Sequence, residues 1–393
     1  MRNMTLLGWT LGMFLCGSGC PRDAGGGGAG AAPPPADLVP VAPTRTILVS
    51  GSCGGNACTP ASVESLTITP DGAFVAYVAL GWSDYIPAPE PRAAVRLASW
   101  TDPALDRQLE ARVCSEAGAV AAALHPGGDR VAVAGLGQGR MVALGGEADA
   151  PLLWRGVAGG AATGIEEPAG DAPRFGDDDW APRQVIPEGR FCDGPRAPAA
   201  SSAAWSPSGE ALALGGYAGS GEAPGWGVWV LDEVGGELRH VWAAPEAVIG
   251  VRVTGWESRG TLVVRTAELP SADATEPGAD DILYRVGAGG GAPEEFGRVD
   301  ANAGTFVLDG RPFTVFPDGA VRDVADGRLV ARLELPASPV PAASERGRGR
   351  EVTAVAAQPG GEVAVALADS VRISVGVAPC CTRLLLFSGV TLR

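Results

Sequence analysis

The chain has 393 residues and a formal net charge of −15, and all 30 of its basic residues are arginine. Such an acidic chain lacks the basic surface that nucleic acids and anionic membranes require, so we predict neither as a partner. The composition includes 58 Gly, 33 Pro and many short Val/Ala/Leu runs, and it favours strands and turns over helices. We therefore expect an all-β protein, long enough for one large repeat domain or two ordinary ones.

The N-terminus has the layout of an export signal. Arg2 precedes an uncharged stretch, Met4 to Cys16, which is too short to span a bilayer as a helix, and small residues lead to Cys20. The segment 1–19 resembles a bacterial lipoprotein signal peptide, although Gly17 stands where that family usually has leucine. The resemblance implies a lipid on Cys20 and a protein anchored to the bacterial membrane, facing the periplasm or the cell surface. Ordinary cleavage with secretion and a retained anchor are the alternatives.

A linker follows the predicted lipidation site. Residues 20–44 are rich in Gly, Ala and Pro and contain almost nothing that a core could bury. Such a composition predicts a disordered tether that holds a domain away from the membrane. A merely frayed terminus is the alternative. The body of the protein would then occupy residues 45–393.

A repeated hairpin is the most informative feature of this body. Each copy consists of a short strand, a turn containing glycine and a second apolar strand, a pattern in which proline presets one turn dihedral and glycine accepts a positive φ. Four copies are clear, at 66–78, 122–134, 203–215 and 355–367, and two weaker ones lie at 253–265 and 305–316. The turn glycines are Gly72, Gly128, Gly209, Gly260, Gly310 and Gly361.

The spacing of these glycines predicts a β-propeller. Most steps are about fifty residues, which is the size of one four-stranded blade. The longest step contains residues 157–200, rich in Pro, Gly and Asp, which we interpret as a loop insertion. We expect six blades, with a hidden seventh blade in that segment as the alternative. Residues 46–51 are expected to close the ring beside a C-terminal strand such as 383–389.

Two copies also carry a family resemblance. Pro70-Asp71-Gly72 and Trp205-Ser206-Pro207-Ser208-Gly209 resemble the repeat of TolB-like and WD-repeat-like propellers, and the resemblance covers about residues 45–393. It implies an envelope binding protein. Peptidase-linked propellers form a second group, but this chain lacks the hydrolase domain that carries their catalytic triad. The resemblance therefore implies no catalytic residue.

The cysteines of the body predict disulfides. An even number of cysteines in an oxidising compartment favours disulfide bridges. The cysteines are not spaced as paired zinc ligands and the chain has only two histidines, which argues against a zinc site. The candidates are Cys53, Cys58, Cys114, Cys192, Cys380 and Cys381. Cys53 and Cys58 are close enough in sequence to close a small loop. Alternatively, one of them joins Cys380 or Cys381 and ties the two ends of the chain together.

Other candidate side chains are few. His125 and His240 occupy positions typical of a scaffold, so a Ser-His-Asp or metal-histidine mechanism has little to work with. The acidic runs at 177–179 and 280–281 lack the spacing of a calcium loop and predict solvated loops. Trp82 and Trp180 fall in probable loops and are candidates for a binding face. We expect no cofactor and no metal.

These observations favour a non-enzymatic scaffold that binds a protein, peptide or glycan through one propeller face or the central channel. An envelope lyase or hydrolase with carboxylates and arginines in the channel is the alternative. Inward Asp, Glu and Arg side chains gathered at one channel mouth would favour the enzyme, and a channel of small side chains would favour the scaffold. A structural module without a ligand is the third possibility.

Overall fold

The computed structural model consists of strands joined by turns. It describes residues 38–49, 61–81, 92–109, 120–135, 138–144, 152–155, 199–218, 225–232, 238–269, 278–338, 347–373 and 376–392. The described residues contain no α-helix, and their only helical turn is a 3-10 turn at Pro103–Leu105. Within these same residues, no helix has the length and apolar character needed to cross a membrane. The all-β prediction is confirmed.

The strands form four-stranded antiparallel sheets, numbered here in chain order. Sheet 1 contains β2 (Ala61–Ile68), β3 (Phe74–Gly81), β4 (Arg92–Ser99) and β5 (Arg107–Leu109). Sheet 2 contains β6 (Ala121–Leu124), β7 (Arg130–Ala134), β8 (Gln138–Ala143) and β9 (Leu152–Arg155). Sheet 3 contains β10 (Ala199–Trp205), β11 (Leu212–Ala218), β12 (Gly225–Leu231) and β13 (Leu238–Ala243).

The C-terminal half repeats this pattern, with one exchange of strands at the end. Sheet 4 contains β14 (Val248–Ser258), β15 (Thr261–Glu268), β16 (Asp280–Gly287) and β17 (Glu294–Asp300). Sheet 5 contains β18 (Gly304–Leu308), β19 (Arg311–Val315), β20 (Ala320–Asp323) and β21 (Leu329–Arg332). Sheet 6 contains β22 (Gly347–Ala357), β23 (Val363–Ile373), β24 (Gly376–Phe387) and, as its outermost strand, β1 (Arg45–Leu48).

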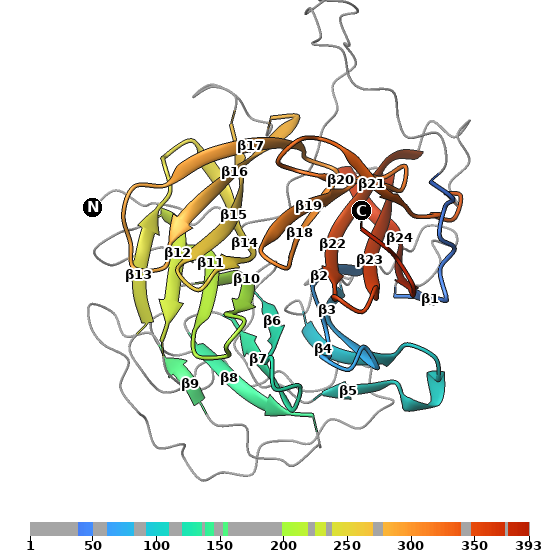
Figure 1. Cartoon of the computed structure of the whole chain (residues 1–393), viewed down its shortest axis with the longest axis horizontal. Coiled ribbons are helices and arrows are strands. Elements are labelled where there is room, and N and C mark those ends of the chain that lie inside the picture. Colours follow the sequence, from blue (N-terminus) through green and yellow to red (C-terminus); the bar gives the residue numbers. More distant parts are fainter. Residues whose placement is uncertain are drawn as a thin grey trace, which may run out of the picture.

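The sheets are arranged around a common centre, as in a β-propeller (Figure 1). The first strand of each sheet is innermost and contacts the first strand of the next, and β22 of sheet 6 contacts β2 of sheet 1. Neighbouring sheets bury apolar side chains against each other, because a single sheet has two apolar faces to cover. Among the described residues, apolar clusters join sheets 1–2, 2–3, 3–4, 5–6 and 6–1.

Polar contacts hold the junction between sheets 4 and 5. Arg265 of β15 forms an ion pair with Asp281 of β16. Its guanidinium also donates to the carbonyl oxygens of Ala301 and Ala303, which precede β18, with 2.8 Å to the oxygen of Ala301. The side chains of both charged partners are only 12% exposed. A partly buried arginine therefore links these two sheets, whereas each of the other five junctions has an apolar cluster among the described residues.

The repeated hairpins predicted from the sequence are confirmed. They are the pairs β2–β3, β6–β7, β10–β11, β14–β15, β18–β19 and β22–β23. Five of the six turn glycines have a positive φ, as expected. The prediction was wrong at Gly260, which does not adopt this conformation. There β14 has a register shift between Trp256 and Ser258, and such a bulge supplies extra twist before the turn.

The predicted closing strand is also confirmed. β1 pairs antiparallel with β24, from Arg45 opposite Leu386 to Leu48 opposite Arg383 (Figure 1). Just before β1, Val41 forms a parallel bridge with Leu333, next to β21 of sheet 5. The Arg45 guanidinium reaches sheet 1, where it pairs with Asp106. The N-terminal segment from Val41 to Leu48 thus connects sheets 5, 6 and 1.

Candidate binding face

Most of the residues that the sequence singled out lie outside the described residues. These are Cys20, Cys53, Cys58, Cys114, Cys192, Trp82, Trp180 and the acidic run 177–179. Cys380 and Cys381 belong to β24, but their side chains are not among those described. The candidate site must therefore be built from other residues of the ring.

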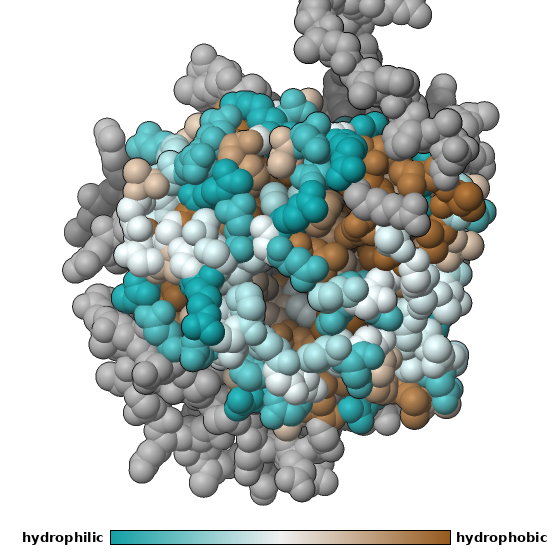
Figure 2. Space-filling model, viewed as in Figure 1, coloured by the Kyte–Doolittle hydropathy of each residue, from teal (hydrophilic) through white to brown (hydrophobic). Residues whose placement is uncertain are grey.

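Three serines of the innermost strands hold neighbouring strands together, whereas the hydroxyls of Thr305 in β18 and Thr353 in β22 are buried without a hydrogen bond among the described residues. The Ser65 side chain of β2 exchanges hydrogen bonds with the backbone of Ala122 in β6. In sheet 3, Ser201 donates to the carbonyl of Val251 at 2.7 Å, and Ser202 accepts from the amide of Val253 at 2.7 Å. Residues of intermediate and hydrophilic character surround most of the central hollow (Figure 2). The three serine hydroxyls bind the ring together and are not available to a ligand.

A channel enzyme would need inward Asp, Glu and Arg side chains at one channel mouth. One row of charged residues, Arg252, Arg265 and Asp281, meets this criterion in part. Arg252 of β14 is exposed and donates to the carbonyl of Thr353 in β22 at 3.1 Å, so it reaches from sheet 4 to sheet 6. Arg252 is opposite Arg265, which pairs with Asp281. Burial raises the pKa of Asp281, and Arg265 opposes this effect. However, Asp281 lies on the third strand of its sheet, so this carboxylate does not line the channel.

Both histidines serve the scaffold, as predicted. The amide of Gly127 donates to Nδ1 of His125 at 3.0 Å, and Nε2 lies 3.3 Å from the carbonyl oxygen of Gly209 in the next sheet. The His125 ring also packs edge-on against Trp205, with the ring centroids 5.0 Å apart. His240 packs against Trp229 at 4.9 Å. In the described part of the chain, no His, Cys, Asp and Glu side chains cluster to hold a metal ion.

His240 predicts a pH dependence of stability. Its partial burial lowers its pKa, because burial disfavours the imidazolium. The unfolded chain therefore takes up this proton first as the pH falls below about 6.5, and stability decreases there. We expect His240→Gln to flatten the fall in unfolding free energy between about pH 7.5 and 5.5, measured by urea denaturation. The effect should be small because the residue is partly exposed; identical pH profiles would contradict it.

The hairpin turns of all sheets meet at one face, which we call the turn face. It consists of the turns between the first and second strands, at 69–73, 125–129, 206–211, 259–260, 309–310 and 358–362. Their approach is close: a Cβ on Gly128 would lie 2.9 Å from Pro70, and one on Gly209 2.5 Å from His125. One acidic residue accompanies each turn: Asp71, Asp129, Glu210, Glu257, Asp309 and Glu362.

These carboxylates differ in their partners. Glu257 is neutralised by Arg285, at 2.7 and 2.9 Å, and Asp129 lies 3.5 Å from Arg130. Hydrogen bonds from Thr69 and Ala73 lower the pKa of Asp71, so it stays ionised without a cation. For Asp309 and Glu362, the described residues provide neither an ion pair nor a side-chain hydrogen bond. Glu210 of sheet 3 accepts a hydrogen bond from Ser208 at 2.8 Å and likewise has no cation among the described residues, so negative charge is unmatched on sheets 3, 5, 6 and 1.

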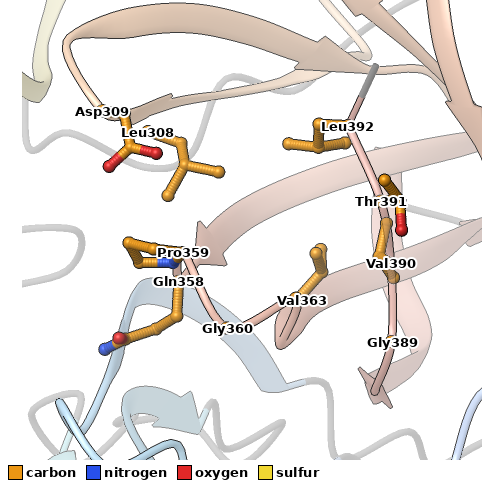
Figure 3. A pocket seen from close by; sticks show the side chains of 11 residues that line it. Leu308, Asp309, Gln358, Pro359, Gly360, Val363, Gly389, Val390, Thr391 and Leu392 are labelled. Atoms are coloured by element: carbon orange, nitrogen blue, oxygen red, sulfur yellow. The ribbon is translucent and has the colours of Figure 1, made fainter.

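An open cavity of about 270 Å³ lies on the turn face between sheets 5 and 6 (Figure 3). Its apolar wall consists of Leu308, Val363, Val390 and Leu392, and Asp309 lies at its edge. The C-terminal residues that follow β24 form one side of it. The arrangement combines a few apolar side chains with a mostly polar accessible lining and one accessible carboxylate.

Our sequence reasoning missed this site. An acidic residue lies within three residues of the turn glycine in every hairpin copy, so an alignment of the copies on their glycines contains the signal. The cavity itself gives no such signal, because its walls come from β18, β23 and the C-terminal tail.

Comparisons with known proteins give structural similarity only. No family model and no curated protein matches the sequence. A solved structure of a putative TolB from Agrobacterium tumefaciens is 10% identical, with 85% of this chain and 93% of that chain covered and a TM-score of 0.38. A protein of unknown function from Bacteroides thetaiotaomicron is 11% identical, with 86% of this chain and 75% of that chain covered and a TM-score of 0.44. The Cps50 (Swd1) β-propeller domain of Myceliophteria thermophila is 12% identical, with 86% of this chain and 99% of that chain covered and a TM-score of 0.38.

A TolB protein and a β-propeller domain are thus among the structures to which the chain is similar. This is the group that the Pro-Asp-Gly and Trp-Ser-Pro turns resemble. The function must be argued from the residues of this chain.

Proposed function

We propose that this protein is an envelope-anchored lipoprotein whose propeller is a non-enzymatic scaffold for a protein, peptide or glycan partner. One observation carries the proposal. The hydroxyls of Ser65, Ser201 and Ser202 and both histidines are engaged within the ring, whereas accessible carboxylates and a cavity gather on the turn face. Such an arrangement has few groups for chemistry and an accessible surface for binding.

Crosslinking in intact envelopes tests the scaffold function. A photoreactive residue placed at an exposed turn-face position such as Ser208, in full-length protein, should give one defined adduct that survives purification. The matched control places the same residue at Tyr217, an exposed position at the far end of β11. If no exposed position gives an adduct in cells, the protein has no partner and the proposal is contradicted.

We further propose six blades, with residues 157–200 forming an insertion rather than a seventh blade. β6 contacts β10 directly, and one apolar cluster spans sheets 2 and 3, so these two sheets are immediate neighbours. The four residues 244–247 already connect β13 to β14 in the same way. Replacing 157–198 by a short Gly-Ser linker should keep the ring folded, as judged by thermal unfolding; a lost blade would instead open the ring and unfold it.

The lipid anchor is proposed on the signal layout before Cys20. Mass analysis of the purified mature protein should find an N-terminal cysteine carrying a diacylglycerol. Cys20→Ser should release the protein from membranes without changing its fold, because Cys20 precedes Val41, the first residue seen to pair with the ring. An unmodified N-terminus beyond residue 20 would reject the anchor in favour of secretion.

The disulfides are proposed on the cysteine count and on the position of the closing strand. β1 ends at Leu48, a few residues before Cys53, and pairs with β24 just after Cys380 and Cys381. A bridge between these two segments would reinforce the pairing of β1 with β24. Peptide mapping without reduction should then find Cys53 or Cys58 joined to Cys380 or Cys381; six free thiols in the exported protein would exclude it.

Trp82 and Trp180 remain proposed contacts, although both lie outside the described residues. The described strands that precede them, β3 and β9, both run away from the turn face. Trp82→Ala and Trp180→Ala should weaken crosslinking if these residues contact the partner. Unchanged crosslinking in both variants would assign binding to another surface.

A further inference from the structure

We propose that the cavity between sheets 5 and 6 binds an arginine or lysine side chain of a protein partner. The inference rests on the proposed scaffold function and specifies its surface and its chemistry. It places part of the contact at the turn face, where Asp309 would meet the cation.

The size and walls of the cavity fit a single long side chain. Its volume, about 270 Å³, lies below the roughly 300 Å³ at which pockets for drug-sized molecules begin. Val363 and Val390 are buried, and Leu308 and Leu392 are partly exposed. Leu308 and Leu392 offer the accessible apolar surface for the aliphatic stem of an arginine or lysine, the rest of the accessible lining is mostly polar, and the charged end stays beside water.

The charge at the edge selects a cation. Asp309 has a φ of 50°, as the first residue of an Asp-Gly hairpin turn, so the turn fixes its backbone. The following basic residue, Arg311, is paired with Asp323 and does not neutralise Asp309. Glu362 is a second unmatched carboxylate of the turn face, but it lies beside Gly360 and against the Gly72 turn of sheet 1, outside the lining of the cavity. A guanidinium or ammonium on Asp309 would form a charge-assisted hydrogen bond.

Other ligand classes fit less well. The Gln358 amide donates to the carbonyl oxygens of Ile68 and Thr69, both at 2.8 Å, and so turns toward sheet 1 (Figure 3). The described lining contains no arginine that would bind an anion. An apolar side chain would leave the carboxylate without a partner. Charge complementarity therefore identifies a basic side chain as the occupant.

Peptide titration tests the inference on the full mature chain. The probes are three labelled peptides, identical except for a central arginine, lysine or citrulline, and Kd is measured by fluorescence anisotropy. Citrulline keeps the shape of arginine without its charge. We expect the arginine and lysine peptides to bind at least about fivefold more tightly than the citrulline peptide.

Two variants locate the binding. Asp309→Asn removes the charge and keeps a turn-compatible residue, and it should weaken binding about tenfold. Thr391→Trp, at an exposed position on the rim, should obstruct the cavity with a similar loss. The matched control is Asp326→Asn, the same change in the Asp-Gly turn at the outer edge of sheet 5, which should alter Kd by less than about twofold.

Three outcomes would overturn the inference. Equal binding of the citrulline peptide excludes a cation site, and equal losses in Asp309→Asn and Asp326→Asn indicate general charge attraction. Tighter binding after Arg393→Gln indicates that the chain's own last residue fills the cavity. The scaffold proposal survives each of these if envelope crosslinking still yields a defined partner, whereas the absence of any adduct contradicts the scaffold function itself.

Discussion

Gly310→Ala is expected to lower the free energy of unfolding by about 3 kcal/mol. Two costs combine at this turn. Gly310 has a φ of 72°, a conformation that an L side chain adopts with strain. A Cβ there would also lie 2.5 Å from the carbonyl oxygen of Glu257 in sheet 4, and a backbone atom cannot move away cheaply. The close packing of neighbouring turns, and not only the turn dihedral, therefore requires glycine.

Two control variants separate these costs. Gly327 has a φ of 69° with open space around it, so Gly327→Ala should cost only about 1 kcal/mol. Gly260 has neither a positive φ nor a close neighbour, so Gly260→Ala should be nearly neutral. Urea unfolding of the three variants measures the loss of unfolding free energy in each. The dependence of this free energy on urea concentration is compared among them. Equal losses of unfolding free energy in Gly310→Ala and Gly327→Ala would show that the contact with Glu257 costs nothing.

Asp369→Asn is expected to be the most damaging charge deletion, at about 4 kcal/mol. The Asp369 carboxylate is 1% exposed in β23 and pairs with two arginines, Arg350 at 3.2 Å and Arg383 at 2.5 Å. Removing its charge leaves two partly buried cations facing each other. The same arginines donate to the carbonyl oxygens of Pro336 and Ala337, which lead out of sheet 5. The substitution should therefore loosen the junction of sheets 5 and 6.

An exposed ion pair provides the control for Asp369. Asp232 and Arg239 lie 2.7 Å apart, but their side chains are 57% and 41% exposed. Water and salt screen such a pair, so Asp232→Asn should cost less than about 1 kcal/mol. Thermal unfolding at low and high salt compares the two variants. If Asp369→Asn is as mild as Asp232→Asn, the buried cluster does not hold the ring.

The hairpins were predictable from the sequence because their information is local. Proline and glycine fix a turn within a few residues, and alternating apolar residues mark the strands on either side. The pairing of β1 with β24 was also predictable, since a ring of repeats needs a strand to close it. Gly260 was misjudged because the register shift in β14 depends on its pairing partner, which the local sequence does not specify.

The candidate site depends on relations between sheets, and these were harder to predict. Asp309 was visible as part of an Asp-Gly turn, but its unmatched charge depends on Arg311 turning to Asp323. Arg265 joins sheets 4 and 5, where the other junctions have an apolar cluster. This contact depends on carbonyl groups that are distant from Arg265 in the sequence. The sequence pointed instead to Trp82 and Trp180, because exposed aromatic residues in loops are recognisable one at a time.

The completion of sheet 6 by both ends of the chain has a consequence for folding kinetics. Arg45 meets Leu386 only after almost the whole polypeptide has been synthesised, so β1 has to wait for β24. Contacts of such high contact order close slowly, because a very long loop must lose its freedom before they form. The last step of maturation is then the docking of the N-terminal strand, and until it happens the edge of β24 is open to pairing with another chain.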